Sequence, residues 1–153
     1  AQIIQTEVNN LTSAGVNKIV LLAHMQQLFI ERELAQRLSN VDIIIAGGSH
    51  TLLADENDRL RPGDTAGGIY PLIEQSPTGA VLVVNTAANY EYVGRLVAEF
   101  DAQGNIDLSK LDPIINGAYA TDDASVSALI SSNPGTPDPE IVAITQTLRD
   151  QVI

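Results

Sequence analysis

The sequence predicts an α/β fold in which a βαβ unit with parallel strands continues into an antiparallel hairpin. Two nearly unbroken apolar runs, residues 18–23 and 41–46, flank a segment whose leucines recur at helical spacing. A third segment, residues 91–101, alternates in the way that strands do. With 153 residues and 44% hydrophobic composition, the chain is long enough to bury the core of one ordinary domain.

The first fifty residues predict helix, strand, helix and strand in turn. Apolar residues at helical spacing favour a first helix over residues 3–11, which Gly15 ends. Strand 18–23 is rich in β-branched residues and is expected to be buried on both faces. Leucines predict a helix over residues 28–38, on which Glu31, Arg32, Glu33 and Arg37 form the solvated face. Strand 41–46 follows and stops at the Gly47-Gly48 turn, so the two strands are expected to be parallel.

The remaining elements follow from turn residues and alternation. Residues 54–79 are expected to form a long surface loop at the rim of a site, in which Arg59 and Arg61 are either solvated charges or contacts for a phosphate. Pro71 places a short strand at 70–74 on a sheet edge, and residues 80–85 form a third buried strand. The alternating segment 91–101 is expected to pair with 106–108 across the turn 103–105. Helices are predicted over 122–130 and 138–152, joined by a linker at 131–137.

Composition excludes several classes of protein. The absence of cysteine rules out a disulfide scaffold, a zinc ribbon and a thiol nucleophile. A formal net charge of -11, from 8 basic and 19 acidic residues, argues against a nucleic-acid polymer or an anionic membrane as a partner. A small phosphorylated substrate stays open, because a local cation can outweigh the overall field. There is no apolar run of the ~18 residues that a membrane-spanning helix needs.

The two histidines of the chain fall at corresponding places. His24 follows the first strand, and His50 follows the second strand after the turn formed by residues 47–49. The carboxyl ends of parallel strands lie on one edge of a sheet, where open α/β sheets bind ligands. The two imidazoles are therefore expected within about one strand spacing, ~5 Å, of each other. They could ligate a metal, or each could satisfy a local backbone group at its strand end.

Three segments of the sequence, residues 19–24, 41–51 and 89–96, together resemble the metallophosphoesterase (calcineurin-like) superfamily, in its 5'-nucleotidase and alkaline-phosphatase-like branch. Residues 19–24 resemble the strand and metal-binding histidine of the second half of the catalytic domain. Residues 41–51 resemble the strand that ends in the Gly-His-x-His signature, and residues 89–96 resemble the following strand with its Tyr and Gly-Arg-Leu run. This resemblance implies half of a metallophosphoesterase β-sandwich flanked by helices.

The resemblance assigns roles to a few residues of this sequence. His24 and His50 match metal ligands, one to each of two cations, whereas Gly48 stands where the signature has its first histidine. One metal would lose a protein ligand unless a neighbouring group or water substitutes. The backbone of Gly48 and Ser49 and, more weakly, Asn89 are expected to contact the substrate. The family's remaining ligands, an Asp-x-His, a bridging Asp and an Asn-His pair, do not occur in these residues, so no catalytic residue is assigned here.

The resemblance therefore implies part of a metal-dependent phosphomonoesterase that hydrolyses nucleotides with metal-activated water. Two divalent ions (Zn, Mn, Co, Mg or Ca) are implied for the intact protein. This chain alone could hold none of them and would be inactive. Residues 1–110 would be the C-terminal half of the catalytic domain, 111–137 an irregular extension and linker, and 138–153 a helix leading to a substrate-binding domain. The implied partners are an N-terminal half-domain and a nucleotide, and the implied location is periplasmic or extracellular.

Two other interpretations stay open. The chain could be a non-catalytic α/β binding or scaffold domain that keeps the fold with incomplete metal ligation, which Gly48 favours. It could also be an unrelated flavodoxin-like domain that binds a small anion. The hairpin expected after residue 90 and the lack of a glycine-rich first turn count against that last interpretation.

Overall fold

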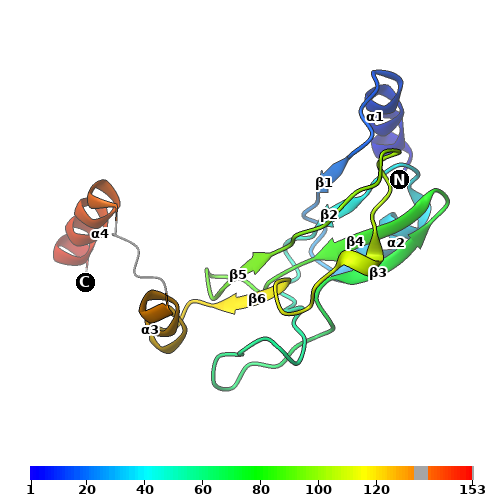
Figure 1. The fold of residues 1–153 in the computed structure, drawn as a ribbon. Coiled ribbons are helices and arrows are strands. Elements are labelled where there is room, and N and C mark those ends of the chain that lie inside the picture. Colours follow the sequence, from blue (N-terminus) through cyan, green and yellow to red (C-terminus); the bar gives the residue numbers. More distant parts are fainter. Residues whose placement is uncertain (133–137, 153) are drawn as a thin grey trace. The chain divides into compact units, whose positions relative to one another are not determined.

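The computed structural model describes residues 1–132 and 138–152, which form two compact units, Ala1–Asp122 and Asp123–Ile153 (Figure 1). The larger unit is a mixed α/β fold, as predicted. The smaller unit holds helices α3 (Asp123–Ser132) and α4 (Pro139–Val152). Asp138 caps α4, since its Oδ1 accepts the Glu140 backbone N–H at 2.8 Å. Residues 133–137 of the predicted linker lie outside the described part.

A four-stranded sheet carries the larger unit, with strand order β1-β2-β4-β3. Its strands are β1 (Val20–Leu22), β2 (Ile43–Ile45), β3 (Leu72–Ser76) and β4 (Gly79–Val84). Strands β1, β2 and β4 run parallel, and β3 pairs antiparallel with β4 at one edge. Helix α2 (Leu28–Arg37) connects β1 to β2, which confirms the predicted βαβ unit and the edge position of the strand after Pro71.

Two helices supply side chains to the core on one face of this sheet. Val8 of α1 (Gln2–Ser13) and Leu34 of α2 belong to the same buried cluster as Ile44 of β2 and Val83 of β4. The register places Leu21, Ile44 and Val83 side by side across the three parallel strands. The helical spacing of the first and second apolar segments is therefore explained by this shared core.

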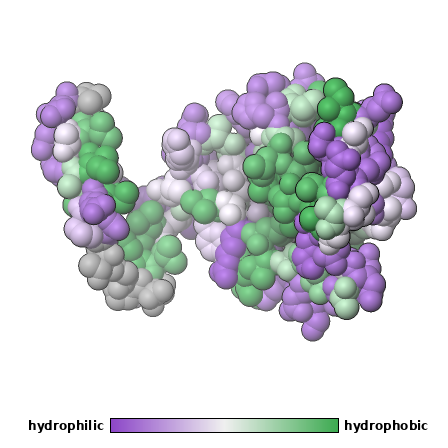
Figure 2. Space-filling model, turned by 90° about the horizontal axis from the view of Figure 1, so that it is seen from above, coloured by the Kyte–Doolittle hydropathy of each residue, from purple (hydrophilic) through white to green (hydrophobic). Residues whose placement is uncertain are grey.

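The opposite face of the sheet is open at β1 and β2, so the expectation that these strands are buried on both faces is wrong for this chain. Val20 is 51% exposed, Leu22 75% and Ile45 46%, although all three are large and apolar. They share one face because residues two apart in a strand point the same way. Figure 2 shows hydrophobic residues gathered on the surface of the larger unit. The sequence pattern is that of a doubly covered sheet, whereas the described chain leaves the second face exposed at β1 and β2 and covers it at β4, where Leu82 and Val84 are buried.

Glu31 also departs from its prediction, because it is completely buried rather than part of the solvated face of α2. It lies three residues after Leu28 and three before Leu34, so helical geometry directs it to the core side. Its Oε1 accepts the backbone N–H of Met25 at 2.9 Å. Its Oε2 has no hydrogen-bond partner within the described residues. The carboxylate thus joins the first turn of α2 to the loop that precedes it.

The antiparallel hairpin is present, but its partner strand differs from the predicted one. Strand β5 (Tyr92–Arg95) pairs with β6 (Gly117–Ala120), and not with residues 106–108. Around the predicted turn, Phe100 and Ile106 form an isolated antiparallel bridge, and the Asp107 N–H donates to the Glu99 carbonyl at 2.9 Å. A 3-10 helix, η1 (Leu108–Lys110), follows. Where the sequence predicts an irregular segment from residue 111, the structure has β6. No described helix has the length and apolar character to cross a membrane.

Glu74 makes stability depend on pH at the contact between α2 and β3. Burial opposes ionisation of this carboxyl group, but hydrogen bonds from Gln36 and Arg32 outweigh burial and lower its pKa below the usual 4.5. A lowered folded-state pKa adds stability that is present above about pH 4.5 and is lost as pH falls through the folded value. Arg32→Met is expected to weaken this acid dependence in urea titrations from about pH 3 to about pH 6.

The matched control for this prediction is Arg37→Met. Arg37 pairs with Glu33 at 3.2 Å on the exposed side of the same helix, and such pairs contribute little. The stability of the Arg37→Met protein should therefore depend on pH as that of the wild type does. If the stability of the Arg32→Met protein depends on pH as that of the wild type does, the acid dependence does not come from the Arg32–Glu74 pair.

Candidate functional site

The candidate site lies at the edge of the sheet where the three parallel strands end. β1 ends at Leu22, β2 at Ile45 and β4 at Val84, and each is followed by an irregular loop. These loops, residues 23–27, 46–51 and 85–91, therefore start from one edge of one rigid sheet. This is the edge at which open α/β sheets bind ligands.

His24 lies against the turn that follows β2. The Ala23 backbone N–H donates to the Ile45 carbonyl at 2.9 Å, which extends the β1–β2 pairing up to the histidine. A Cβ atom placed on Gly47 would lie 2.9 Å from His24 Nδ1 and 3.1 Å from the Ala23 carbonyl oxygen. Position 47 therefore requires glycine, since any side chain would displace the imidazole. His24, the first predicted ligand, therefore packs against the Gly47-Gly48 turn that follows β2.

Ser49 and His50 have different surroundings within the next turn. The Ser49 hydroxyl accepts from Asn85 Nδ2 at 2.7 Å and donates to Thr51 Oγ1 at 3.0 Å. Asn85, which is buried at the end of β4, thus ties the β2 loop to the β4 loop. His50 is exposed and has a φ of 56°. Ser49 has a structural role here, while the His50 side chain faces solvent.

Backbone strain gathers at this edge. Six described non-glycine residues have a left-handed φ, and five of them follow β1, β2 or β4: Gln26, His50, Ala87, Asn89 and Tyr90. Such conformations cost of order 1–3 kcal/mol each and concentrate at functional sites. Asn89, the weakly predicted substrate contact, is exposed within this strained loop. The distribution of backbone strain and the positions of the two histidines therefore indicate the same edge of the sheet as the functional site.

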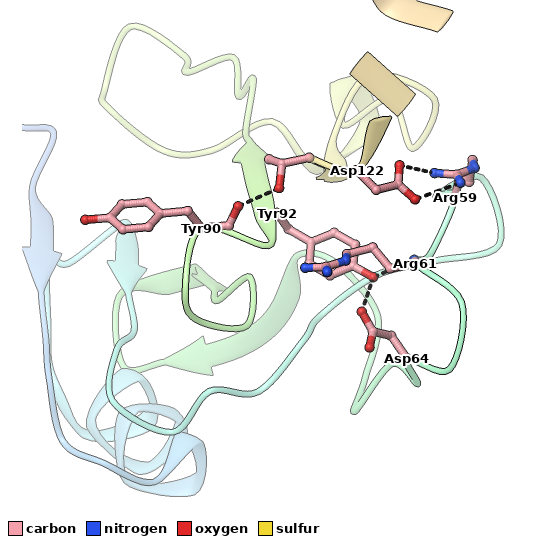
Figure 3. A network of polar contacts seen from close by, with 7 residues as sticks. Arg59, Arg61, Asp64, Tyr90, Tyr92 and Asp122 are labelled. Atoms are coloured by element: carbon pink, nitrogen blue, oxygen red, sulfur yellow. Dashed lines mark hydrogen bonds and ion pairs between the residues drawn. The ribbon is translucent and has the colours of Figure 1, made fainter. Parts of the chain in front are cut away.

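Arg59 and Arg61 each pair with a carboxylate, and Figure 3 shows the pair that Arg59 forms with Asp122. Arg59 binds both carboxylate oxygens of Asp122, at 2.7 and 2.9 Å. Arg61 Nη1 lies 3.4 Å from Glu91 Oε1. Both arginines therefore neutralise acidic groups of the β5–β6 region, which favours their structural role over a phosphate contact.

Tyr92 fastens the same long loop to β5. Its hydroxyl donates to Asp64 Oδ2 at 2.7 Å and accepts the Arg61 backbone N–H at 2.8 Å. Burial and the hydrogen bond to Asp64 raise the pKa of this phenol. The loop expected to rim the site is thus held at several points along β5 and β6 (Figure 3).

The residues at the edge fit part of a metal site. No group of three His, Cys, Asp or Glu side chains suited to a metal occurs in residues 1–132 and 138–152. The chain can supply two imidazoles, which are ligands suited to Zn²⁺. A dinuclear site needs more ligands than these.

Sequence similarity relates the chain to proteins of known activity, although no family model matches it. The chain is 33% identical over 129 residues to a 5'-nucleotidase from Bos taurus and 34% identical to one from Homo sapiens. Each alignment covers 84% of this chain and 22% of the relative. The chain is a 5'-nucleotidase-like region. It spans about a fifth of the length of these relatives.

Solved structures agree with this 5'-nucleotidase-like region. The 5'-nucleotidase precursor of Thermus thermophilus has a TM-score of 0.60 and 30% identity, covering 94% of this chain and 27% of that one. The NAD nucleotidase of Haemophilus influenzae has a TM-score of 0.67, covering 97% of this chain and 34% of that one. At 24% identity, the second likeness concerns the fold alone. The predicted resemblance and the α/β fold class are confirmed.

Two residues, Glu31 and Gln26, escaped sequence reasoning about the site. Glu31 could have been found from its i±3 relation to Leu28 and Leu34, which is a core position. Gln26 carries no comparable signal, because a polar residue after a strand is ordinary turn chemistry. Its importance comes from a contact between two loops that are separate in the sequence.

Proposed function

We propose that the longer polypeptide containing this 5'-nucleotidase-like region hydrolyses phosphate monoesters of nucleotides. The proposal depends on one observation: a region 33–34% identical to 5'-nucleotidases places its two histidines after adjacent parallel strands. Divalent cations, two in the intact protein, would activate a water molecule and neutralise charge on the phosphoryl oxygens.

Each residue of the edge has a stated part in this proposal. His24 and His50 would hold the cations, one each. The Gly47–Gly48 turn would let the backbone approach a phosphate closely, and the Gly48 and Ser49 amides would donate to it. Asn89 would contact the substrate from the strained loop after β4. Asn85 would keep the β2 and β4 loops together through Ser49.

The open face of the sheet supports the proposal that another part of the polypeptide completes the catalytic domain. A pocket of about 520 Å³ lies on this face. It is lined by Val20, Ile43, Ile45, Val84 and Leu96. Apolar side chains on an exposed sheet face are stabilised when a second layer covers them. We infer that the N-terminal half of the domain supplies this layer, that α4 leads toward a substrate-binding domain, and that the protein works in the periplasm or outside the cell.

Phosphate release by the full-length protein tests this function. After chelation, the protein is titrated with Mg²⁺, Mn²⁺, Zn²⁺ or Co²⁺ in the presence of AMP or p-nitrophenyl phosphate. Chelation is expected to abolish phosphate release, and at least one of the four ions is expected to restore it. The isolated 153-residue chain is the control and should show no turnover, because its two histidines cannot hold a dinuclear site.

A non-catalytic binding or scaffold role is the alternative, favoured by the absence of a side chain at Gly48. It predicts no phosphate release from either substrate with any of the four ions. Robust turnover by the isolated chain would instead contradict the proposal that half of the site lies elsewhere in the polypeptide.

A further inference from the structure

We propose that Gln26 supplies the cation-binding group that position 48 lacks, so that its side-chain carboxamide serves as an oxygen ligand beside His24. This inference rests on the proposed function and names a residue that the sequence does not single out. Gly48 has no side chain with which to bind a cation. The neighbouring loop fills the space in which such a side chain would begin.

The position of the Gln26 carboxamide follows from the contacts of Gly48. A Cβ atom placed on Gly48 would lie 2.9 Å from Gln26 Nε2, 3.0 Å from Gln26 Cδ and 3.0 Å from His24 Cδ2. The carboxamide and this edge of the imidazole therefore flank the same point. His24 Cδ2 is bonded to Nε2, whereas Nδ1 faces Gly47. Nε2 is therefore bonded to the ring atom that lies 3.0 Å from the Gly48 Cβ position, on which the Gln26 carboxamide also borders.

The backbone holds Gln26 in this place. Gln26 has a φ of 67°, a left-handed conformation that non-glycine residues seldom adopt. Its N–H donates to the Gly47 carbonyl at 3.4 Å, and the preceding Met25 N–H donates to buried Glu31. The loop is therefore anchored on both the β2 turn and α2. Residues held in such conformations concentrate where a side chain must be aimed at a ligand.

The chemistry of a carboxamide sets the class of cation. The orientation of a Gln amide is assigned from its hydrogen bonds, and a half-turn exchanges Nε2 with Oε1. Oε1 would then be a neutral oxygen ligand next to an imidazole. Oxygen ligands suit Mg²⁺, Mn²⁺ and Ca²⁺, while imidazole suits Zn²⁺. Compared with a site that has histidine at position 48, this site should favour Mn²⁺ over Zn²⁺.

The test measures Mn²⁺ binding to the full-length protein by calorimetry and by elemental analysis, with no substrate present. Gln26→Met keeps the length of the side chain but removes its oxygen, and is expected to weaken Mn²⁺ binding at least about tenfold or to lose one ion. Gln26→Glu keeps an oxygen and should bind Mn²⁺ as tightly as the wild type or more tightly. Gln27→Ala is the matched control, since Gln27 is exposed and its side chain does not cap α2.

The outcomes separate this inference from the proposed function. A wild-type protein that binds no Mn²⁺, Zn²⁺, Mg²⁺ or Co²⁺ would overturn both. Binding that His24→Ala weakens but Gln26→Met leaves unchanged would overturn only the role of Gln26. Gln26 is supported as an oxygen ligand if Gln26→Met binds Mn²⁺ more weakly than the wild type while Gln26→Glu and Gln27→Ala keep wild-type binding.

Discussion

His24→Ala in the full-length protein is expected to lower kcat/KM for phosphate release from AMP by at least about 100-fold. This factor corresponds to about 2.7 kcal/mol of lost transition-state stabilisation. The reason is structural: β1–β2 pairing and the glycine at position 47 hold the imidazole at the strand edge, and alanine keeps that backbone while removing the proposed ligand. Activity assays and elemental analysis of bound metal measure the two consequences together.

Met25→Ala provides the control for this variant. Met25 is adjacent, its side chain is 42% exposed, and its backbone N–H contact with Glu31 survives the substitution. Its activity and metal content should stay near those of the wild type. A His24→Ala protein with unchanged metal content would exclude His24 as a ligand.

Gly117→Ala is expected to lower the free energy of unfolding by about 2–3 kcal/mol or more, the range of severe overpacking. A Cβ atom at position 117 would lie 2.0 Å from Asp58 Oδ1. That oxygen accepts the Ala118 N–H at 3.0 Å, and Oδ2 accepts the Asp55 N–H at 2.9 Å. The added methyl group must therefore expel the carboxylate that joins the long loop to β6. Urea titration measures the change in the free energy of unfolding, and hydrogen exchange of the Ala118 amide measures how often β6 opens at that position.

The double variant separates this steric effect from a general weakness of β6. Asp58→Ala removes the atoms that the methyl group would strike, so Gly117→Ala should cost much less in that background. Equal costs in both backgrounds would show that the close approach to Asp58 is not the cause.

The βαβ unit could be predicted because its signals are local. The apolar runs at 18–23 and 41–46 and the leucines between them have the periods of strand and helix, and Gly47-Gly48 marks the stop. The exposure of Val20 and Leu22 could not be predicted in the same way. An apolar run indicates that a strand is covered, but it does not say which part of a polypeptide covers it.

The partner of β5 could not be predicted because its determinants are distant in the sequence. The turn at 103–105 favours a local hairpin, whereas the strand that pairs with β5 consists of Gly117, Ala118, Tyr119 and Ala120. Its position depends on Asp58, about sixty residues earlier, and on the missing side chain at Gly117. The same holds for the candidate site. The two histidines could be placed because each follows a predicted strand, whereas the contact between Gln26 and Gly48 joins two loops and could not be predicted.

The open apolar face of the sheet bears on how the polypeptide is made. Domains fold as units during translation, and the N-terminal part leaves the ribosome first. If the covering half precedes Ala1, as we propose, it is already available when β1 and β2 emerge, so Leu22 and Ile45 need not meet other nascent chains. A gene rearranged to translate this region first would expose these strands, and we expect it to yield insoluble protein.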